Sequence, residues 1–97
     1  MKTLPNKVST KGFFIIKNDR GLHTRPSTEI VKRAAMFSSE IKLIYQKVET
    51  NAKSLLGILM LAAPKGAKIK IMAYGEDAEE AVESLVSLAG SNFNIKY

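Results

Sequence analysis

The chain has 97 residues, a net charge of +6 and 45% hydrophobic residues. It is therefore long enough for one small domain and too short for two separate cores. It has no cysteine and a single histidine, which excludes a disulfide scaffold, a cysteine nucleophile and cysteine-ligated or multi-histidine metal sites within the chain. We expect one domain over residues 1–97, with a core at about residues 11–90, short polar tails, and no metal or cofactor.

The apolar runs are too short to span a bilayer, and the polar start lacks the apolar stretch of a signal peptide. We therefore expect a cytoplasmic protein with no membrane insertion. The charge is unevenly placed. Residues 1–75 hold 14 Lys and Arg against four acidic residues, whereas residues 76–97 hold five acidic residues against Lys96. A basic body favours an acidic partner, a phosphorylated partner or nucleic acid.

The first elements in chain order are a strand and a helix. Residues 13–16 form a β-prone run that ends in the turn-like stretch 17–21. Pro26 suits the first turn of a helix, and Thr24 could act as its N-cap. Apolar residues then recur at helical spacing until residues 38–39 end the helix; they are Ile30, Val31, Ala34 and Ala35.

The second half repeats strands and helices. Alternation predicts a strand over residues 41–45, a turn at 46–47 and a short returning strand at 48–50. Asn51 and Ser54 are candidate N-caps for a helix over residues 55–63, which residues 64–66 stop. A strand over residues 67–74 presents its lysines to water, and a last helix begins near residue 78, with Gly90 as its C-terminal cap.

The predicted order is βαββαβα. It indicates an α+β fold of the open-faced β-sandwich type, in which three helices cover one face of a four-stranded antiparallel sheet.

His23 is the main candidate for chemistry. An isolated histidine is usually a surface or capping residue, but this one lies between a glycine-marked turn and a helix start. Unpaired amides and the positive end of the helix dipole bind phosphate there, at Thr24, Pro26 and Ser27. Arg25 can add a forked, permanently charged contact. A nucleophilic ring nitrogen beside an anion site has the parts of a phosphoryl acceptor.

Two motifs carry a resemblance to a known family. Gly-Leu-His-Thr-Arg-Pro at residues 21–26 resembles the active-site motif of the HPr family, the histidine-containing phosphocarriers of the bacterial phosphoenolpyruvate-dependent phosphotransferase system. Asn-Ala-Lys-Ser-Leu-Leu-Gly at residues 51–57 resembles that family's second signature, and Gly-Glu-Asp at 75–77 also matches. The resemblance covers residues 13–88.

The resemblance implies a transient carrier rather than an enzyme. Enzyme I would phosphorylate His23 at Nδ1, and the phosphoryl group would pass to IIA proteins or domains. Arg25 would be the charge partner of the phosphate. Thr24 and Ser27 stand where the family usually has alanine, and both are small enough for a helix start. The expected protein is a monomer without a nucleic-acid partner.

Ser54 carries two interpretations. It suits the N-cap of the second helix whether or not it has another role. The resemblance adds regulatory phosphorylation by HPr kinase/phosphorylase, which would place negative charge at a helix start beside the docking face.

The helix predicted over residues 55–63 is too apolar to face one core stripe. It is either buried on most sides or partly exposed as a docking surface. The resemblance favours exposure of Leu55, Leu56 and Leu59. Lys53 would contribute to a basic rim that attracts acidic partners, together with Arg25, Lys32, Arg33 and Lys47.

Two alternatives stay open. One is a phosphocarrier of the nitrogen-type branch, whose output is regulation rather than sugar import. The other is a small basic nucleic-acid-binding domain, although aromatic residues make up only 7% of the chain and do not interleave with its basic residues.

Overall fold

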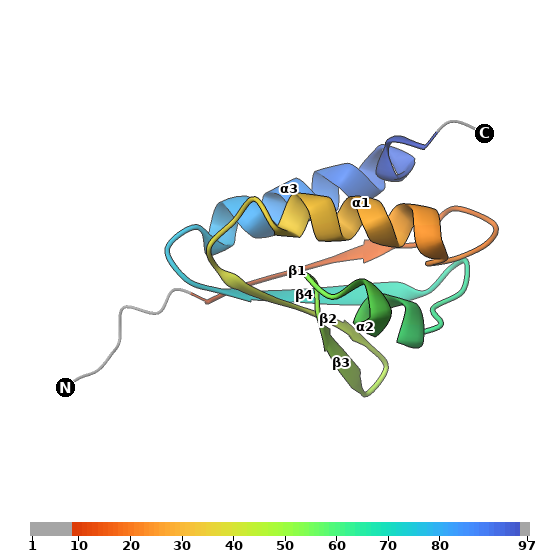
Figure 1. The fold of residues 1–97 in the computed structure, drawn as a ribbon, viewed down its shortest axis with the longest axis horizontal. Helices are drawn as coiled ribbons and strands as arrows, with labels where there is room; N and C mark the ends of the chain where they lie inside the picture. The colour runs from red at the N-terminus through yellow and green to blue at the C-terminus, as the bar shows by residue number, and fades with distance from the viewer. Residues whose placement is uncertain (1–8, 96–97) are drawn as a thin grey trace.

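The computed structural model describes residues 9–95 as a two-layer α+β fold (Figure 1). The polar segment 1–8 and the end of the chain at 96–97 lie outside the described residues. Eight elements follow one another, in the order β1 (Ser9–Ile15), α1 (Thr24–Ala34), β2 (Glu40–Tyr45), β3 (Val48–Asn51), α2 (Leu55–Met60), β4 (Lys68–Tyr74), α3 (Ala78–Gly90) and the short η1 (Asn92–Asn94). None of the described helices is long and apolar enough to cross a membrane.

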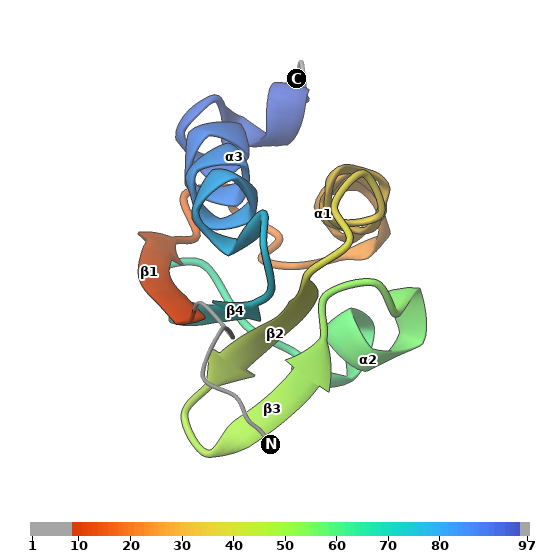
Figure 2. The same ribbon diagram turned by 90° about the vertical axis from the view of Figure 1, so that its left-hand side faces the viewer.

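The four strands form one antiparallel sheet in the order β1-β4-β2-β3. All helices cover the same face of it, with α1 beside α3 and α2 next to β3 (Figure 2). This arrangement confirms the predicted βαββαβα order and the open-faced sandwich. Side chains alternate along β4, so its isoleucines are buried while Lys68 and Lys70 are exposed on the open face. The lysines of this strand therefore face water, as predicted.

The core lies between the sheet and the helices. Ile41, Leu43, Ile69 and Ile71 from the sheet are completely buried against apolar side chains of the three helices. Beyond α3, Phe93 is buried and packs edge-to-face on Phe14, with 5.8 Å between ring centroids. The core therefore extends past the expected limit at residue 90, and the tail that follows α3 is not simply polar.

Three predicted boundaries are wrong. β1 begins at Ser9, because the whole strand pairs with β4 despite its polar start. α2 ends at Met60 rather than residue 63. Ala62 adopts a left-handed φ of 51°, which turns the chain so that the Ala63 carbonyl accepts a hydrogen bond from Leu22. Gly90 is the last residue of α3 and not its cap, because Ser91 takes the C-cap position.

Asp77 connects the start of α3 to the loop between α1 and β2. Its carboxylate accepts backbone hydrogen bonds from Ser38 and Ser39, each 2.9 Å long, and hydroxyl hydrogen bonds from the same two serines. These donors lower the pKa of Asp77 from 3.8 to about 2, with the hydrogen bond from the Ser39 hydroxyl as the largest cause. The charged carboxylate is therefore the form that holds this loop.

We predict an acid-dependent loss of stability from this contact. The folded pKa of Asp77 is below its unfolded value, so its contribution is complete above about pH 4 and declines as the pH falls toward 2. Urea-unfolding midpoints at pH 6 and pH 3 should differ less in Asp77→Asn than in the parent. Glu76→Gln, which removes the neighbouring exposed carboxylate, is the control. Equal acid dependence in Asp77→Asn and the parent would show that the carboxylate does not hold the loop.

Candidate functional site

A turn fixed by hydrogen bonds places His23 at the start of α1. Gly21 has a left-handed φ of 68°, and a Cβ there would collide with the Ala63 carbonyl. Its amide donates to the Asn18 carbonyl at 3.1 Å, and its own carbonyl accepts from the Asn18 side chain and from the His23 amide. Leu22 donates to the Ala63 carbonyl at 2.9 Å. The turn is thus fixed both internally and against the chain that follows α2.

His23 itself is the N-cap residue of α1. It has extended dihedrals, and its carbonyl accepts the first helical hydrogen bond from the Ser27 amide at 3.2 Å. The expectation that Thr24 caps the helix is therefore wrong, because Thr24 is the first residue inside it. An α-helix leaves its first amides without intrahelical partners. Since Pro26 has no N–H, the amides available to an anion are those of Thr24 and Arg25.

Ser27 contributes to the site in a different way from the one expected. Its side chain is completely buried, and its hydroxyl donates to the Leu22 carbonyl at 3.2 Å. Its backbone amide already donates a hydrogen bond to the His23 carbonyl. Pro26 is buried as well. Both residues therefore shape the helix start from within and offer no donor to a bound phosphate.

The surroundings of the imidazole favour its neutral form. Burial of the ring is the first cause of a lowered pKa for His23, and the positive charges of Arg20 and then Arg25 lower it further. Its Nε2 atom is buried without a hydrogen-bond partner. A neutral ring keeps one nitrogen lone pair free for attack. Because Nε2 is enclosed, we expect Nδ1 to be the nitrogen that a reacting group approaches.

Ser54 is the N-cap of α2, as predicted. Its Oγ accepts a hydrogen bond from the Gly57 amide at 3.0 Å. Asn51, the other candidate cap, instead accepts from the Lys53 amide through its side chain at 2.8 Å and stabilises the turn before the helix. The side chain of Ser54 is half-buried at the end of β3 and the start of α2.

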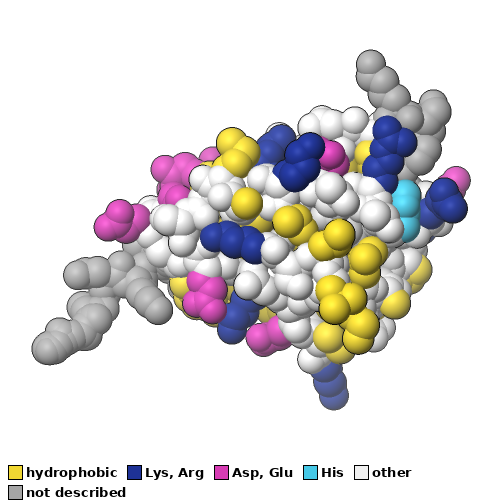
Figure 3. Space-filling model, viewed as in Figure 1, with side chains coloured by type: hydrophobic (Ala, Val, Ile, Leu, Met, Phe, Trp, Pro, Cys, Tyr) yellow, Lys and Arg dark blue, Asp and Glu magenta, His cyan; other side chains and the backbone are white. Residues whose placement is uncertain are grey.

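The apolar surface of α2 is exposed rather than buried. Leu56 is 70% exposed, Leu55 is 37% exposed and Leu59 is half-buried. Met60, with 73% exposure, extends the same surface, whereas Ile58 faces the core. We call Leu55, Leu56, Leu59 and Met60 the α2 patch. Figure 3 shows apolar side chains gathered over α2 on the same face as the imidazole, which is the cyan group above them.

Three of the five expected rim residues make polar contacts within the protein. The ammonium group of Lys32 lies 3.5 Å from the carboxylate of Glu29. The ammonium group of Lys53 donates to the Phe37 carbonyl at 2.7 Å, just beyond the end of α1. Arg33 donates to the Ser84 hydroxyl at 2.9 Å and so connects α1 to α3. Arg25, Lys32 and Lys47 are exposed. The basic surface therefore depends on the exposed residues, while Lys53 mainly holds the loop before α2 in place.

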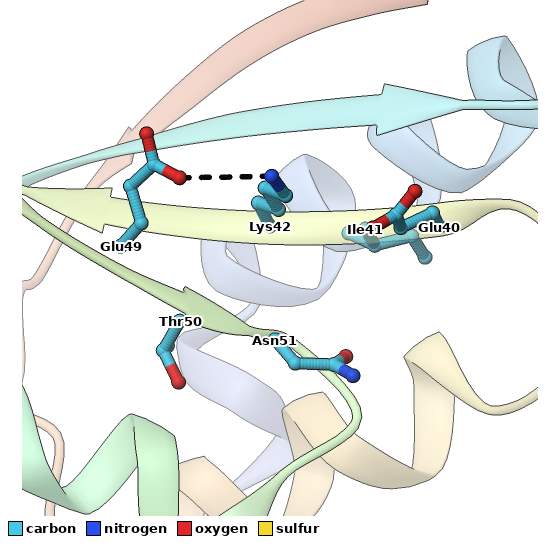
Figure 4. A pocket seen from close by; sticks show the side chains of 6 residues that line it. All are labelled: Glu40, Ile41, Lys42, Glu49, Thr50 and Asn51. Carbon is cyan, nitrogen blue, oxygen red and sulfur yellow. Dashed lines mark ion pairs between the residues drawn. The ribbon is translucent and has the colours of Figure 1, made fainter.

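A hollow away from the imidazole lies between β2 and β3 (Figure 4). It contains the ion pair between Lys42 and Glu49, whose charged atoms are 3.7 Å apart, and is lined by Glu40, Ile41, Lys42, Glu49, Thr50 and Asn51. It holds no nucleophilic histidine. Within residues 9–95, no three His, Cys, Asp or Glu side chains gather as metal ligands would.

Sequence reasoning missed two parts of this region. Arg20 precedes the motif at residues 21–26 and stands out in the sequence only as part of the turn-like stretch 17–21, although its charge lowers the pKa of His23. Met60 belongs to the apolar run of the predicted helix over residues 55–63, although it is among the most exposed side chains of α2. The three-residue spacing between Arg20 and His23 across a glycine turn was the available signal for the first. Nothing in the pattern distinguished Met60 from its buried neighbours.

Comparisons with known proteins match one kind of protein. The family model described as "PTS HPr component phosphorylation site" matches residues 11–91. Phosphocarrier protein HPr of Buchnera aphidicola is 48% identical over 65 residues, which cover 67% of this chain and 76% of that protein. The multiphosphoryl transfer protein of Haemophilus influenzae is 40% identical over 77 residues, which cover 76% of this chain and 15% of that longer protein.

Solved structures agree with this assignment. The crystal structure of HPr-C-His from Thermoanaerobacter tengcongensis has a TM-score of 0.85 and 39% sequence identity, and the match covers 91% of this chain and 99% of that one. The match therefore covers most of the two-layer fold. With its sequence motifs, its fold and its relatives in agreement, the chain belongs to the HPr family of phosphocarriers.

Proposed function

We propose that the protein carries a phosphoryl group on His23 between Enzyme I and IIA proteins or domains of the phosphotransferase system. The observation that carries this proposal is the setting of the imidazole, which belongs to the N-cap residue of a helix and has its pKa lowered by burial and by the charges of two arginines. Such a carrier works in the cytoplasm, where it meets Enzyme I.

The transfer step exchanges one bond to phosphorus for another. The lone pair of Nδ1 attacks the phosphorus of the donor, the new N–P bond forms, and the donor group leaves with the electron pair of the bond that breaks. The amides of Thr24 and Arg25 and the guanidinium of Arg25 receive the charged oxygens. No second histidine or carboxylate is needed, because the protein only holds the group until a second partner takes it.

The α2 patch supports the proposal of protein partners. An apolar surface of this kind, rimmed by polar residues, is typical of a docking site. Its exposed members lie on the face that carries the imidazole (Figure 3). A partner seated on Leu55, Leu56 and Met60 would exclude water from the transfer site. The exposed cations Arg25 and Lys32 would attract an acidic partner to this face.

The nucleic-acid alternative has less support. Phe13 is the exposed aromatic residue on the open face of the sheet, but the ammonium of Lys68 lies 4.4 Å from its ring centroid. That contact occupies a ring face on which a base would stack. Whether the output is sugar import or regulation of the nitrogen-type branch depends on the partners and not on this geometry.

The direct test of the function uses His23→Ala. The parent, incubated with phosphoenolpyruvate and a bacterial Enzyme I, should gain the mass of one acid-labile phosphoryl group. His23→Ala should gain none and should keep a thermal transition close to that of the parent, because its imidazole is a partly exposed surface group. A fully labelled Ala variant would refute the assignment.

Arg25→Ala should slow the transfer without abolishing it. The variant loses one charge-assisted contact, worth about 1.5–3 kcal/mol, or roughly a tenfold to hundredfold lower rate, while the helix amides remain. Lys70→Ala removes an exposed cation from the open face of the sheet, away from the helices, and serves as the matched control. Equal rates for the two variants in a rapid-quench transfer assay would remove Arg25 from the site.

The pair Ser54→Asp and Ser54→Asn tests the regulatory proposal. Both side chains are good N-caps, so both should preserve the Gly57 hydrogen bond and the thermal stability. Only Asp places a charge beside Leu55, where it would repel an acidic partner and mimic part of a phosphate. Titration of Enzyme I should therefore show weaker binding by Ser54→Asp than by Ser54→Asn.

Ser54→Ala provides the complementary control. It should lose roughly 0.5–2 kcal/mol of stability with its cap and still accept phosphate from Enzyme I. If Ser54→Asp binds as tightly as Ser54→Asn, Ser54 is a cap alone and the docking surface lies elsewhere.

A further inference from the structure

Arg20 lies beside the imidazole but outside the motif at residues 21–26. It is exposed on the turn that precedes His23. Arg20 and Arg25 are the two residues whose charges lower the pKa of His23, and Arg20 is the larger cause of the two. Figure 3 shows basic side chains on both sides of the cyan imidazole.

The backbone holds Arg20 at a fixed place relative to the ring. The turn from Asn18 to His23 is closed by the hydrogen bond from Gly21 to Asn18 at 3.1 Å and by that from His23 to Gly21 at 2.9 Å. Asn18 is 4% exposed and donates its side-chain amide back to the Gly21 carbonyl. This fixed turn places Arg20 three residues before His23, so we expect its long side chain to reach a phosphoryl group on the ring.

The charge of Arg20 is available for a ligand. The neighbouring carboxylate of Asp19 is directed to Lys65, and the charged atoms of this pair are 2.7 Å apart. Among the ion pairs formed by residues 9–95, none involves Arg20. Arg20 lines a hollow together with Lys17, Asn18, Asp19 and Asn92, next to the turn that carries His23. The local balance at this hollow is positive once Asp19 is paired with Lys65.

We propose that Arg20 is a second phosphate-binding cation, so that a phosphoryl group on His23 is held between the guanidinium groups of Arg20 and Arg25. The inference rests on the proposed phosphorylation of His23. Arg20 forms and breaks no covalent bond. It donates N–H groups to the phosphoryl oxygens, which carry about two negative charges in the carrier form.

Arg20 and Arg25 act in the same direction on the free ring and on the phosphorylated ring. Both raise the cost of a proton on the free ring, so they favour the neutral nucleophile before transfer, and both attract the phosphoryl oxygens after transfer. Removal of Arg20 should therefore raise the pKa of the unphosphorylated His23 and destabilise the phosphorylated form.

The test compares Arg20→Gln with Lys17→Gln. Lys17 lines the same hollow, but its charge is not among the causes of the lowered His23 pKa. Arg20→Gln should slow transfer from Enzyme I by about threefold to tenfold, as the loss of one exposed charge-assisted contact implies. It should also raise the His23 pKa, followed by NMR of the ring protons. Lys17→Gln should leave both close to the parent, within about twofold in rate.

Arg20→Lys separates charge from geometry. It should restore most of the lowering of the His23 pKa, because the positive charge returns. It should restore less of the transfer rate, because an ammonium lacks the fork that matches phosphate oxygens. A parent that gains no phosphoryl group would refute the proposed function, and with it this role for Arg20. If the parent is labelled and Arg20→Gln matches Lys17→Gln in both readouts, the carrier function stands and the role of Arg20 is refuted.

Discussion

The close packing of the Gly21 turn against the chain after α2 is the constraint on which the site depends. Gly21 takes a left-handed conformation with no room for a Cβ next to the Ala63 carbonyl, and Leu22 pairs with that carbonyl. Any larger residue at position 21 would push the turn away from residues 63 and 64. The ring of His23 would then lose the burial that lowers its pKa and encloses Nε2. One backbone contact therefore supports both the burial that lowers the pKa of His23 and the enclosure of Nε2.

The same contact explains the shape of α2. The helix is short because the chain must reverse at Ala62 to bring Ala63 to Leu22. A helix of six residues can bury only a narrow stripe, here Ile58, and the remaining apolar side chains stay outside. The exposed α2 patch and the fixed histidine turn are therefore consequences of one packing arrangement. This explains physically why an apolar docking surface and a phosphoryl-acceptor candidate lie on one face.

Much of the fold could be predicted from the sequence. Alternation in β4, the apolar spacing of α1 and the helix start at Ser54 all depend on nearest-neighbour chemistry, so the pattern alone was sufficient. The failures came from tertiary contacts. Pairing with β4 extended β1 into polar residues, contact with Leu22 shortened α2, and burial of Phe93 against Phe14 drew the segment after α3 into the core. None of these leaves a local signature.

In the site, too, local features could be predicted from the sequence and tertiary contacts could not. The position of His23 at a helix start could be predicted from the motif and from Pro26. Its role as the N-cap could not, because residues with small polar side chains are the usual caps and Thr24 offered one. The inward direction of the Ser27 hydroxyl and the use of Lys53 to hold Phe37 depend on distant residues. The influence of Arg20 on the ring required the folded turn.

We infer that the fold leaves Nδ1 of His23 as the ring nitrogen open to phosphorylation. The most direct test of this inference is NMR of the phosphorylated protein with ¹⁵N-labelled histidine. The phosphorus–nitrogen coupling and the ¹⁵N shifts identify which nitrogen carries phosphorus. Because Nε2 is buried without a partner, phosphorus should be attached to Nδ1. A phosphorus bond at Nε2, or at no nitrogen of His23, would contradict the account.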